Sequence, residues 1–156
     1  MSAIKQPAIQ QPAIRQPVIR QFQVTFDCAE PGRVARFWCE VLGYVMSAPA
    51  GFTSWEEYEA SRAPEERDSW CACTDPSGVG PRLYFQRVPE GKAVKNRVHL
   101  DVRVGTGLVG EERLAVLKAE AARLEALGAR QVQVLYDGHD SCIPMLDVEG
   151  NEFCVD

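Results

Sequence analysis

Apolar and polar residues alternate along four segments of the chain, and this alternation predicts four β-strands. The segments are 21–27, 82–87, 97–104 and 152–156. Because successive side chains of a strand point to opposite faces, each strand has one apolar and one polar face. The apolar faces carry Phe22, Val24, Phe26, Leu83, Phe85, Val98, Leu100, Val102, Phe153 and Val155. We expect these side chains to face the core.

Two other segments repeat apolar residues at helical spacing. They are 31–42 and 111–127, and each ends in a Leu-Gly pair followed by a short strand, at 44–46 and 131–135. The apolar stripes consist of Val34, Phe37, Trp38, Val41 and Leu42 in the first helix and of Leu114, Leu117, Ala121, Leu124 and Leu127 in the second. Such stripes are typical of helices that cover one face of a sheet.

The two halves of the chain repeat the same order of elements. A strand precedes each helix, and a D-x-x-G turn, at 75–78 and at 147–150, precedes the last strand of each half. Each half therefore predicts a βαβββ module, with module one at 21–88 and module two at 97–156. The predicted fold class is α+β, in which both modules form one cupped eight-stranded mixed sheet with the helices on its convex face.

The polar faces of the four strands gather side chains that carry chemistry. They contribute Gln23, Tyr84, Gln86, Arg97, His99, Asp101, Glu152 and Cys154. One interpretation is an outer sheet face that only meets water. The other is a ligand-binding cup, which is favoured because a solvated face does not need Tyr, Gln, His and Cys together.

The segment 47–69 separates the two parts of module one. Ser54 and Glu57 form a capping-box pattern, which predicts a short helix at 54–62. Three aromatic residues lie in or beside this segment: Trp55, Tyr58 and Trp70. They fit a lid over a planar ligand, and the alternative is that they only cover the edge of the sheet.

Charge and composition exclude several classes of protein. The net charge is −5, and residues 1–20 carry three basic residues and no acidic one, so the remainder carries 14 basic against 22 acidic residues, or −8. An acidic body argues against nucleic-acid binding, which needs clustered Lys and Arg. No apolar run approaches the roughly 18 residues that span a membrane. Since the first residues also lack the apolar core of a secretory signal, we expect a cytoplasmic protein.

Residues 1–20 form a repetitive tail rich in Pro, Gln and Ile. Isoleucine recurs every five residues, with a proline between successive isoleucines. This period fits neither a helix nor a strand, and proline favours extended backbone, so we expect an extended tail. Two interpretations stay open, a leader without chemistry and an arm that docks its isoleucines on a partner subunit.

The chain has six cysteines, which we expect to be reduced thiols. The chain is larger than a typical disulfide scaffold and shows no export signal. Cys71 and Cys73 form a C-x-C pair without a second pair at zinc-finger spacing, which argues against a structural zinc site.

Five stretches of the sequence resemble the vicinal-oxygen-chelate superfamily, the fold of glyoxalases, bleomycin-resistance proteins and ring-cleaving dioxygenases. They are FDCAEPGRVARFW at 26–38, VLGY at 41–44, RLYFQRV at 82–88, NRVHLDV at 96–102 and DVEGNEFCV at 147–155. The chain is most similar to glyoxalase-like single-domain proteins. The resemblance implies a glyoxalase-like domain at 21–156, with 47–69 as the variable segment, and a cup that is usually completed in a homodimer.

The resemblance also implies positions for a divalent metal. Gln23, Gln86, His99 and Cys154 fall at the four ligand positions. Cys154 stands where glyoxalases carry the glutamate that binds metal and moves the proton, so classical glyoxalase I activity is disfavoured. Ring-cleaving dioxygenases need two histidines and a carboxylate on Fe(II), and this cup offers one histidine.

Two functions of different class follow for this chain. The first is a protein that binds or sequesters a small molecule of unknown identity without chemistry, as resistance proteins of the superfamily do. The alternative is a metal-dependent lyase or related enzyme, for which Asp101 or Glu152 offers the anionic oxygen that the four ligand positions lack.

Overall fold

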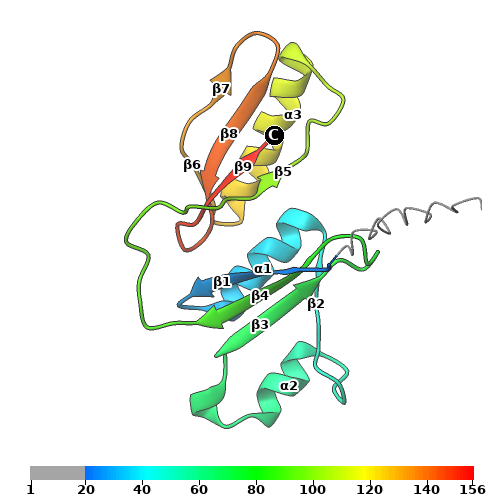
Figure 1. The fold of residues 1–156 in the computed structure, drawn as a ribbon, viewed down its shortest axis with the longest axis vertical. Helices are drawn as coiled ribbons and strands as arrows, with labels where there is room; N and C mark the ends of the chain where they lie inside the picture. Colours follow the sequence, from blue (N-terminus) through cyan, green and yellow to red (C-terminus); the bar gives the residue numbers. More distant parts are fainter. Residues whose placement is uncertain (1–19) are drawn as a thin grey trace, which may run out of the picture.

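The computed structural model describes residues 20–156, and it contains two βαβββ modules arranged one above the other (Figure 1). The predicted extended tail lies outside the described residues except for Arg20. Within residues 20–156, no helix has both the length and the apolar character needed to cross a membrane.

Module one is built on a four-stranded sheet. Its elements are β1 (Gln23–Cys28), α1 (Pro31–Leu42), β2 (Val45–Met46), β3 (Trp70–Thr74) and β4 (Arg82–Arg87). The strand order is β1-β4-β3-β2, in which β1 runs parallel to β4 and the other pairs are antiparallel. A short helix, α2 (Trp55–Ser61), and a 3-10 turn, η1 (Pro64–Glu66), lie between β2 and β3.

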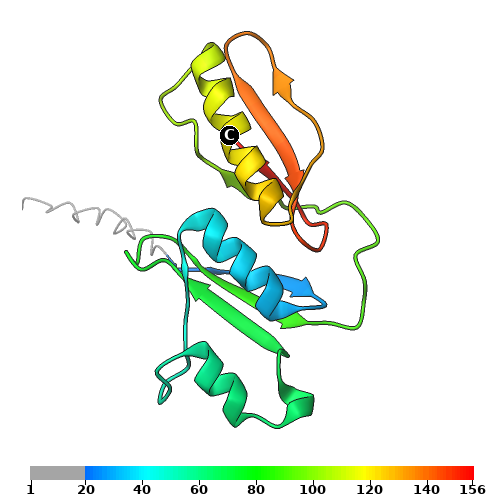
Figure 2. The same cartoon turned by 180° about the vertical axis from the view of Figure 1, so that it is seen from behind.

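Module two repeats this arrangement. Its elements are β5 (Asp101–Val102), α3 (Gly110–Ala126), β6 (Arg130–Gln131), β7 (Leu135–Tyr136), β8 (Ser141–Leu146) and β9 (Glu152–Val155). The order is β5-β9-β8-β6, with β7 also paired to β8 and with β5 parallel to β9. Seen from behind, α1 and α3 cover the same side of the two sheets (Figure 2).

The two mixed βαβββ modules and their helices confirm the predicted fold class. The strands, however, form two hydrogen-bonded sheets of four and five strands, and no ladder joins β1 to β5 within residues 20–156. The segment 97–104 pairs only at 101–102, and 131–135 divides between β6 and β7.

For this reason, two residues that were predicted to lie in the core are exposed. Phe22 is 70% exposed and Val98 is 78% exposed, because both lie outside the paired parts of their strands. Leu127, expected on the buried stripe of the second helix, lies just beyond α3 and is also exposed. The remaining alternation is confirmed where the strands pair, since Leu83, Phe85, Phe153 and Val155 are buried.

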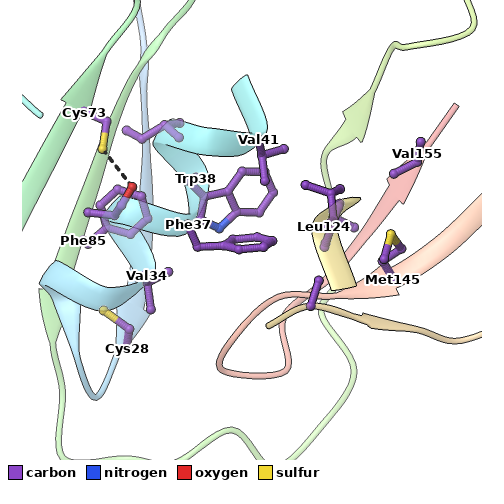
Figure 3. Packing of buried hydrophobic residues seen from close by; sticks show 14 of the residues in the cluster. Cys28, Val34, Phe37, Trp38, Val41, Cys73, Phe85, Leu124, Met145 and Val155 are labelled. Atoms are coloured by element: carbon purple, nitrogen blue, oxygen red, sulfur yellow. Dashed lines mark hydrogen bonds between the residues drawn. The ribbon is translucent and has the colours of Figure 1, made fainter. Parts of the chain in front are cut away.

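The core joins the two modules through α1. Phe37 and Trp38 of α1 point toward Leu124 and Met145 of module two (Figure 3). The Trp38 ring lies 5.3 Å from the ring of Phe153. The indole N–H of Trp38 donates a hydrogen bond of 3.2 Å to the buried Asp147 carboxylate. Packing of this kind makes the two modules one hydrophobic unit.

Local sequence explains where α1 begins and ends. Pro31 occupies the first turn, where its missing N–H costs nothing. Gly43 adopts a left-handed conformation (φ 69°) directly after the last helical residue, which glycine does at little cost. The backbone N–H groups of Ala29 and Glu30, before the helix, donate to the Glu149 carboxylate of module two at 2.8 and 2.7 Å.

Candidate functional site

A cleft of about 950 Å³ lies between the modules. It is bounded by β1, by the start of α1, by the segment 88–100 that connects β4 to β5, and by the turn before β9. Its walls include Val24, Thr25, Phe26, Asp27, Arg33, Trp38, Val88, Glu90, Lys92, Asn96, Arg97, Val98, His99, Leu100, Glu149, Asn151 and Glu152. A volume of this size is typical of pockets that hold small organic molecules.

The walls of the cleft are partly apolar. Phe26 contributes an aromatic ring, whose centroid lies 5.2 Å from that of the buried Trp38 behind it, and Leu100 contributes an aliphatic side chain from the other module. Such a surface suits an apolar or aromatic ligand body.

Two carboxylates of the cleft are held by backbone N–H groups. Glu149 accepts hydrogen bonds from two residues that precede α1. Glu152 accepts from the N–H of Asn96 at 2.9 Å and lies 3.0 Å from the ammonium of Lys92. The Asn96 N–H, followed by Lys92, lowers the pKa of Glu152 to about 2. Both carboxylates therefore tie the connecting segment and the modules together.

The cations of the cleft differ in how they are paired. Arg33 lies 2.8 Å from Glu30, and Lys92 lies beside Glu152. Arg97 makes no ion pair and no side-chain hydrogen bond with any residue between 20 and 156. It is exposed at the cleft and has all its guanidinium donors available for an anionic group.

A cluster of three possible metal ligands lies next to the cleft and consists of His99, Asp101 and Cys154. Of these, His99 lines the cleft. One ligand atom from each lies within 4.8 Å of the others, and His99 Nε2 is 3.3 Å from Asp101 Oδ1. The register explains the cluster, because Asp101 on β5 pairs with Cys154 on β9 and His99 is two residues before Asp101. Period-two alternation thus places all three on one face.

The Cys154 thiol is neutral in this environment. Burial raises its pKa to about 12, with further contributions from the Cys142 thiol and from Asp101. A bound metal ion would reverse this effect, because coordination deprotonates a thiol. Nitrogen, oxygen and sulfur donors at this spacing suit a borderline-soft divalent cation.

The predicted cup residues of module one lie elsewhere. Gln23 contacts Arg82 and Thr25, and Gln86 Nε2 donates to Asp27 at 2.7 Å. Tyr84 stacks on Trp70 with 5.4 Å between ring centroids. These side chains share the polar face of the first sheet and are not among the residues that line the cleft. Of the predicted set, Arg97, His99 and Glu152 line it, and Asp101 and Cys154 adjoin it through His99.

The aromatic residues predicted as a lid pack on one another. The helix predicted at 54–62 is confirmed as α2, and Ser54 Oγ accepts a hydrogen bond from the Glu57 N–H. Trp70 lies 4.8 Å from Trp55 and 5.6 Å from Tyr58, measured between ring centroids. In Figure 1, α2 lies beyond β3, on the far side from module two. None of the three aromatic residues lines the cleft.

Several cleft residues were missed by the sequence analysis. Thr25 and Asp27 share the parity of Gln23 on the same strand, so the alternation contained a signal for them. Arg33 and Glu149 come from a helix and a turn that are 116 positions apart (149 − 33), and no pattern in the sequence brings them together. Lys92 and Asn96 belong to the connecting segment, which has no periodicity.

Comparisons with known proteins find the same architecture. The model of the glyoxalase-like domain family matches residues 23–155. A glyoxalase/bleomycin resistance protein/dioxygenase family enzyme from Burkholderia phytofirmans PsJN is 16% identical, with a TM-score of 0.56 over 85% of this chain and 94% of that one. Fosfomycin resistance protein FosX from Listeria monocytogenes is 8% identical, with a TM-score of 0.59 over 89% of this chain and 93% of that one.

A variant of that FosX has been solved with Mn(II) and 1S,2S-dihydroxypropylphosphonic acid; it is 9% identical, with a TM-score of 0.58 over 89% of this chain and 90% of that one. At these identities the likeness shows a shared fold. No curated protein sequence matches the chain.

Proposed function

Because the chain belongs to the glyoxalase-like domain family, we propose that it binds a small organic acid in the cleft between its modules. The observation that carries this proposal is Arg97, which has no ion-pair partner among residues 20–156 and lies at a cleft with an apolar wall. An acid with an apolar body would place its carboxylate on the guanidinium and its body against the half-buried Phe26 and Leu100. Binding needs no chemical step, in keeping with the absence of a glutamate at position 154.

The neighbouring charges favour this orientation of the ligand. Glu149 and Glu152 accept hydrogen bonds from backbone N–H groups, and neither forms an ion pair with Arg97. His99 lies at the same wall, 3.3 Å from Asp101, and an N–H of its ring can add a second hydrogen-bond donor. A bidentate Arg–carboxylate contact gives both affinity and orientation.

Binding of aryl acids tests the proposal. We expect phenylacetate to perturb the fluorescence of Trp38 and the amide signals of 97–100, and Arg97→Ala to weaken this binding about tenfold, the effect of one charge-assisted contact. Lys95→Ala is the matched control, since Lys95 belongs to the same segment but does not line the cleft. Phenylacetamide and phenethylamine serve as comparison ligands, because they have a similar apolar body but no negative charge.

Equal binding of the acid and the amide, or undiminished binding by Arg97→Ala, would contradict the proposal.

Sedimentation of the same samples reports the oligomeric state. We propose a homodimer, because the outer edges of β1 and β5 have no hydrogen-bonded strand within residues 20–156 and exposed apolar residues lie beside both edges.

A metal-dependent enzyme is the second candidate, and the cluster of His99, Asp101 and Cys154 favours it. The donor set fits a divalent metal such as zinc, with three protein ligands and an open position for a substrate. When bound, the metal would act as a Lewis acid on a substrate oxygen. His99 would connect the metal to the cleft, and Asp101 is the carboxylate of the cluster that could hold a proton.

Metal titration distinguishes this candidate from binding without metal. We expect one Zn(II) per chain and, with Co(II), an absorption band of a thiolate ligand that disappears in Cys154→Ser. Affinity should fall at least tenfold in that variant, because a hard hydroxyl replaces a soft thiolate. Cys28→Ser is the control for losing a thiol outside the cluster. An unchanged band in Cys154→Ser, or substoichiometric metal, would rule out the site.

A further inference from the structure

Two thiols meet between α1 and β3, in a part of the protein that the cleft does not use. Cys39 lies in the last turn of α1 and Cys73 lies on β3. Their sulfur atoms are 2.9 Å apart. Cys73 Sγ also donates to the carbonyl of Ala35 at 3.4 Å, which fixes its position against α1 (Figure 3).

The two thiols differ in exposure and acidity. Cys73 is fully buried, whereas Cys39 is only half-buried. The close contact between the two sulfurs lowers the pKa of Cys39 and, together with burial, raises the pKa of Cys73. Since a thiolate is the nucleophile in thiol chemistry, Cys39 is the reactive member.

We propose that Cys39 and Cys73 form a peroxide-reactive pair that closes reversibly to a disulfide linking α1 to β3. A disulfide has a sulfur–sulfur distance of 2.03–2.05 Å. The two sulfurs therefore need to approach by less than 1 Å from their 2.9 Å separation. The partners are 34 residues apart in the sequence, so the bond would close a long loop of the unfolded chain.

The oxidation balances with hydrogen peroxide as the two-electron oxidant. The Cys39 thiolate attacks one peroxide oxygen, the O–O bond breaks, and hydroxide leaves, so that Cys39 becomes a sulfenic acid. The Cys73 sulfur then attacks the Cys39 sulfur and displaces the sulfenic hydroxyl. That hydroxyl takes the Cys73 proton and leaves as water. Both electrons come from the two sulfurs, and a dithiol such as dithiothreitol returns them.

The surroundings make this pair more reactive than the other cysteines. Burial raises the pKa values of Cys28 and Cys71 to about 12, which keeps both as thiols. Cys142 and Cys154 adjoin each other on β8 and β9, but burial raises both of their pKa values as well. Among these cysteines, Cys39 is the one whose pKa lies below the ordinary value of a thiol.

The test is oxidation of the full chain with hydrogen peroxide, followed by non-reducing peptide mapping. We expect the intact mass to fall by about two daltons and the free-thiol count to fall from six to four, with a cross-linked peptide that contains Cys39 and Cys73. The mass change should reverse with dithiothreitol, and the oxidised protein should melt several degrees higher because the unfolded chain is constrained.

Variants separate this pair from the other thiols. Cys39→Ala should lose thiols at least tenfold more slowly than the unaltered chain and form no cross-link. Because Cys39 is half-buried, this variant is expected to fold, which its circular dichroism checks. Cys142→Ala should oxidise like the unaltered chain. A two-dalton loss that persists in Cys39→Ala, a cross-link that maps to another pair, or oxygen addition at Cys39 without a cross-link would overturn the proposal.

Discussion

Replacement of Trp38 by alanine is expected to lower the free energy of unfolding by about 4 kcal/mol, as removal of a large buried aromatic side chain does. Trp38 is 1% exposed and lies between the two modules. Its ring contacts Phe26 of β1 at 5.2 Å and Phe153 of β9 at 5.3 Å between centroids. The cavity left by alanine would therefore lie at the junction of both sheets, where neither can close it alone.

Trp38→Phe separates the two contributions of this side chain. Phenylalanine keeps an aromatic ring in the junction but removes the N–H that donates to Asp147. We expect an intermediate loss of about 2 kcal/mol, from one unmade hydrogen bond to a buried carboxylate together with a smaller ring. Urea unfolding, followed by circular dichroism, measures both values.

Leu127→Ala is a suitable control because Leu127 is exposed and lies just beyond the end of α3. It should change the free energy of unfolding by less than about 0.5 kcal/mol. A Trp38→Ala variant that loses less than 1 kcal/mol would show that the modules are held together by something other than this junction.

Most of the fold could be predicted because local patterns and tertiary packing agree. The stripe of α1 predicts which residues are buried, and Val34, Phe37 and Val41 are buried. The alternation along β4 places Leu83 and Phe85 in the core. The superfamily resemblance seen in the motifs is confirmed by the family match over 23–155.

The prediction was wrong where pairing, not pattern, decides the structure. The alternation of 97–104 is as regular as that of β4, yet only 101–102 form a ladder. A pattern reports which side chains suit a strand, whereas a ladder also needs a neighbour at the right place. The single sheet of eight strands was inferred from two similar halves, and similarity between halves does not specify which edges join.

The candidate site was likewise predicted where the strand pattern decides it and missed where packing between the modules decides it. His99, Asp101 and Cys154 come together because strand parity and register place them on one face, and parity can be seen in the sequence. The cleft depends instead on how the modules pack. Glu149 reaches the residues before α1 through hydrogen bonds of 2.7 and 2.8 Å, a contact between segments with no shared pattern.

Arg113 is a second residue whose importance the sequence did not indicate. It follows Glu111 and Glu112 in the first turn of α3, where a charged side chain would ordinarily be solvated. It is instead 7% exposed. Its guanidinium donates to the carbonyl of Gly105 and to Asp156 Oδ1, both at 2.7 Å, and lies 3.0 Å from Asp140.

Arg113→Met is expected to lower the free energy of unfolding by about 3 kcal/mol, because methionine fills the space but removes the donor to two buried carbonyl groups and one of the two arginines that pair with the Asp156 carboxylate. Lys118→Met on the exposed side of the same helix is the matched control and should cost little. Adding Asp156→Asn to Arg113→Met should recover part of the loss, since it removes a charge that has lost one of its two arginine partners and keeps only Arg103, at 3.0 Å. Equal stability of Arg113→Met and Lys118→Met in urea would show that the contacts of Arg113 do not stabilise the fold. A double variant no more stable than Arg113→Met would show that the loss comes from the carbonyl groups of Gly105 and Ser141, to which the guanidinium also donates.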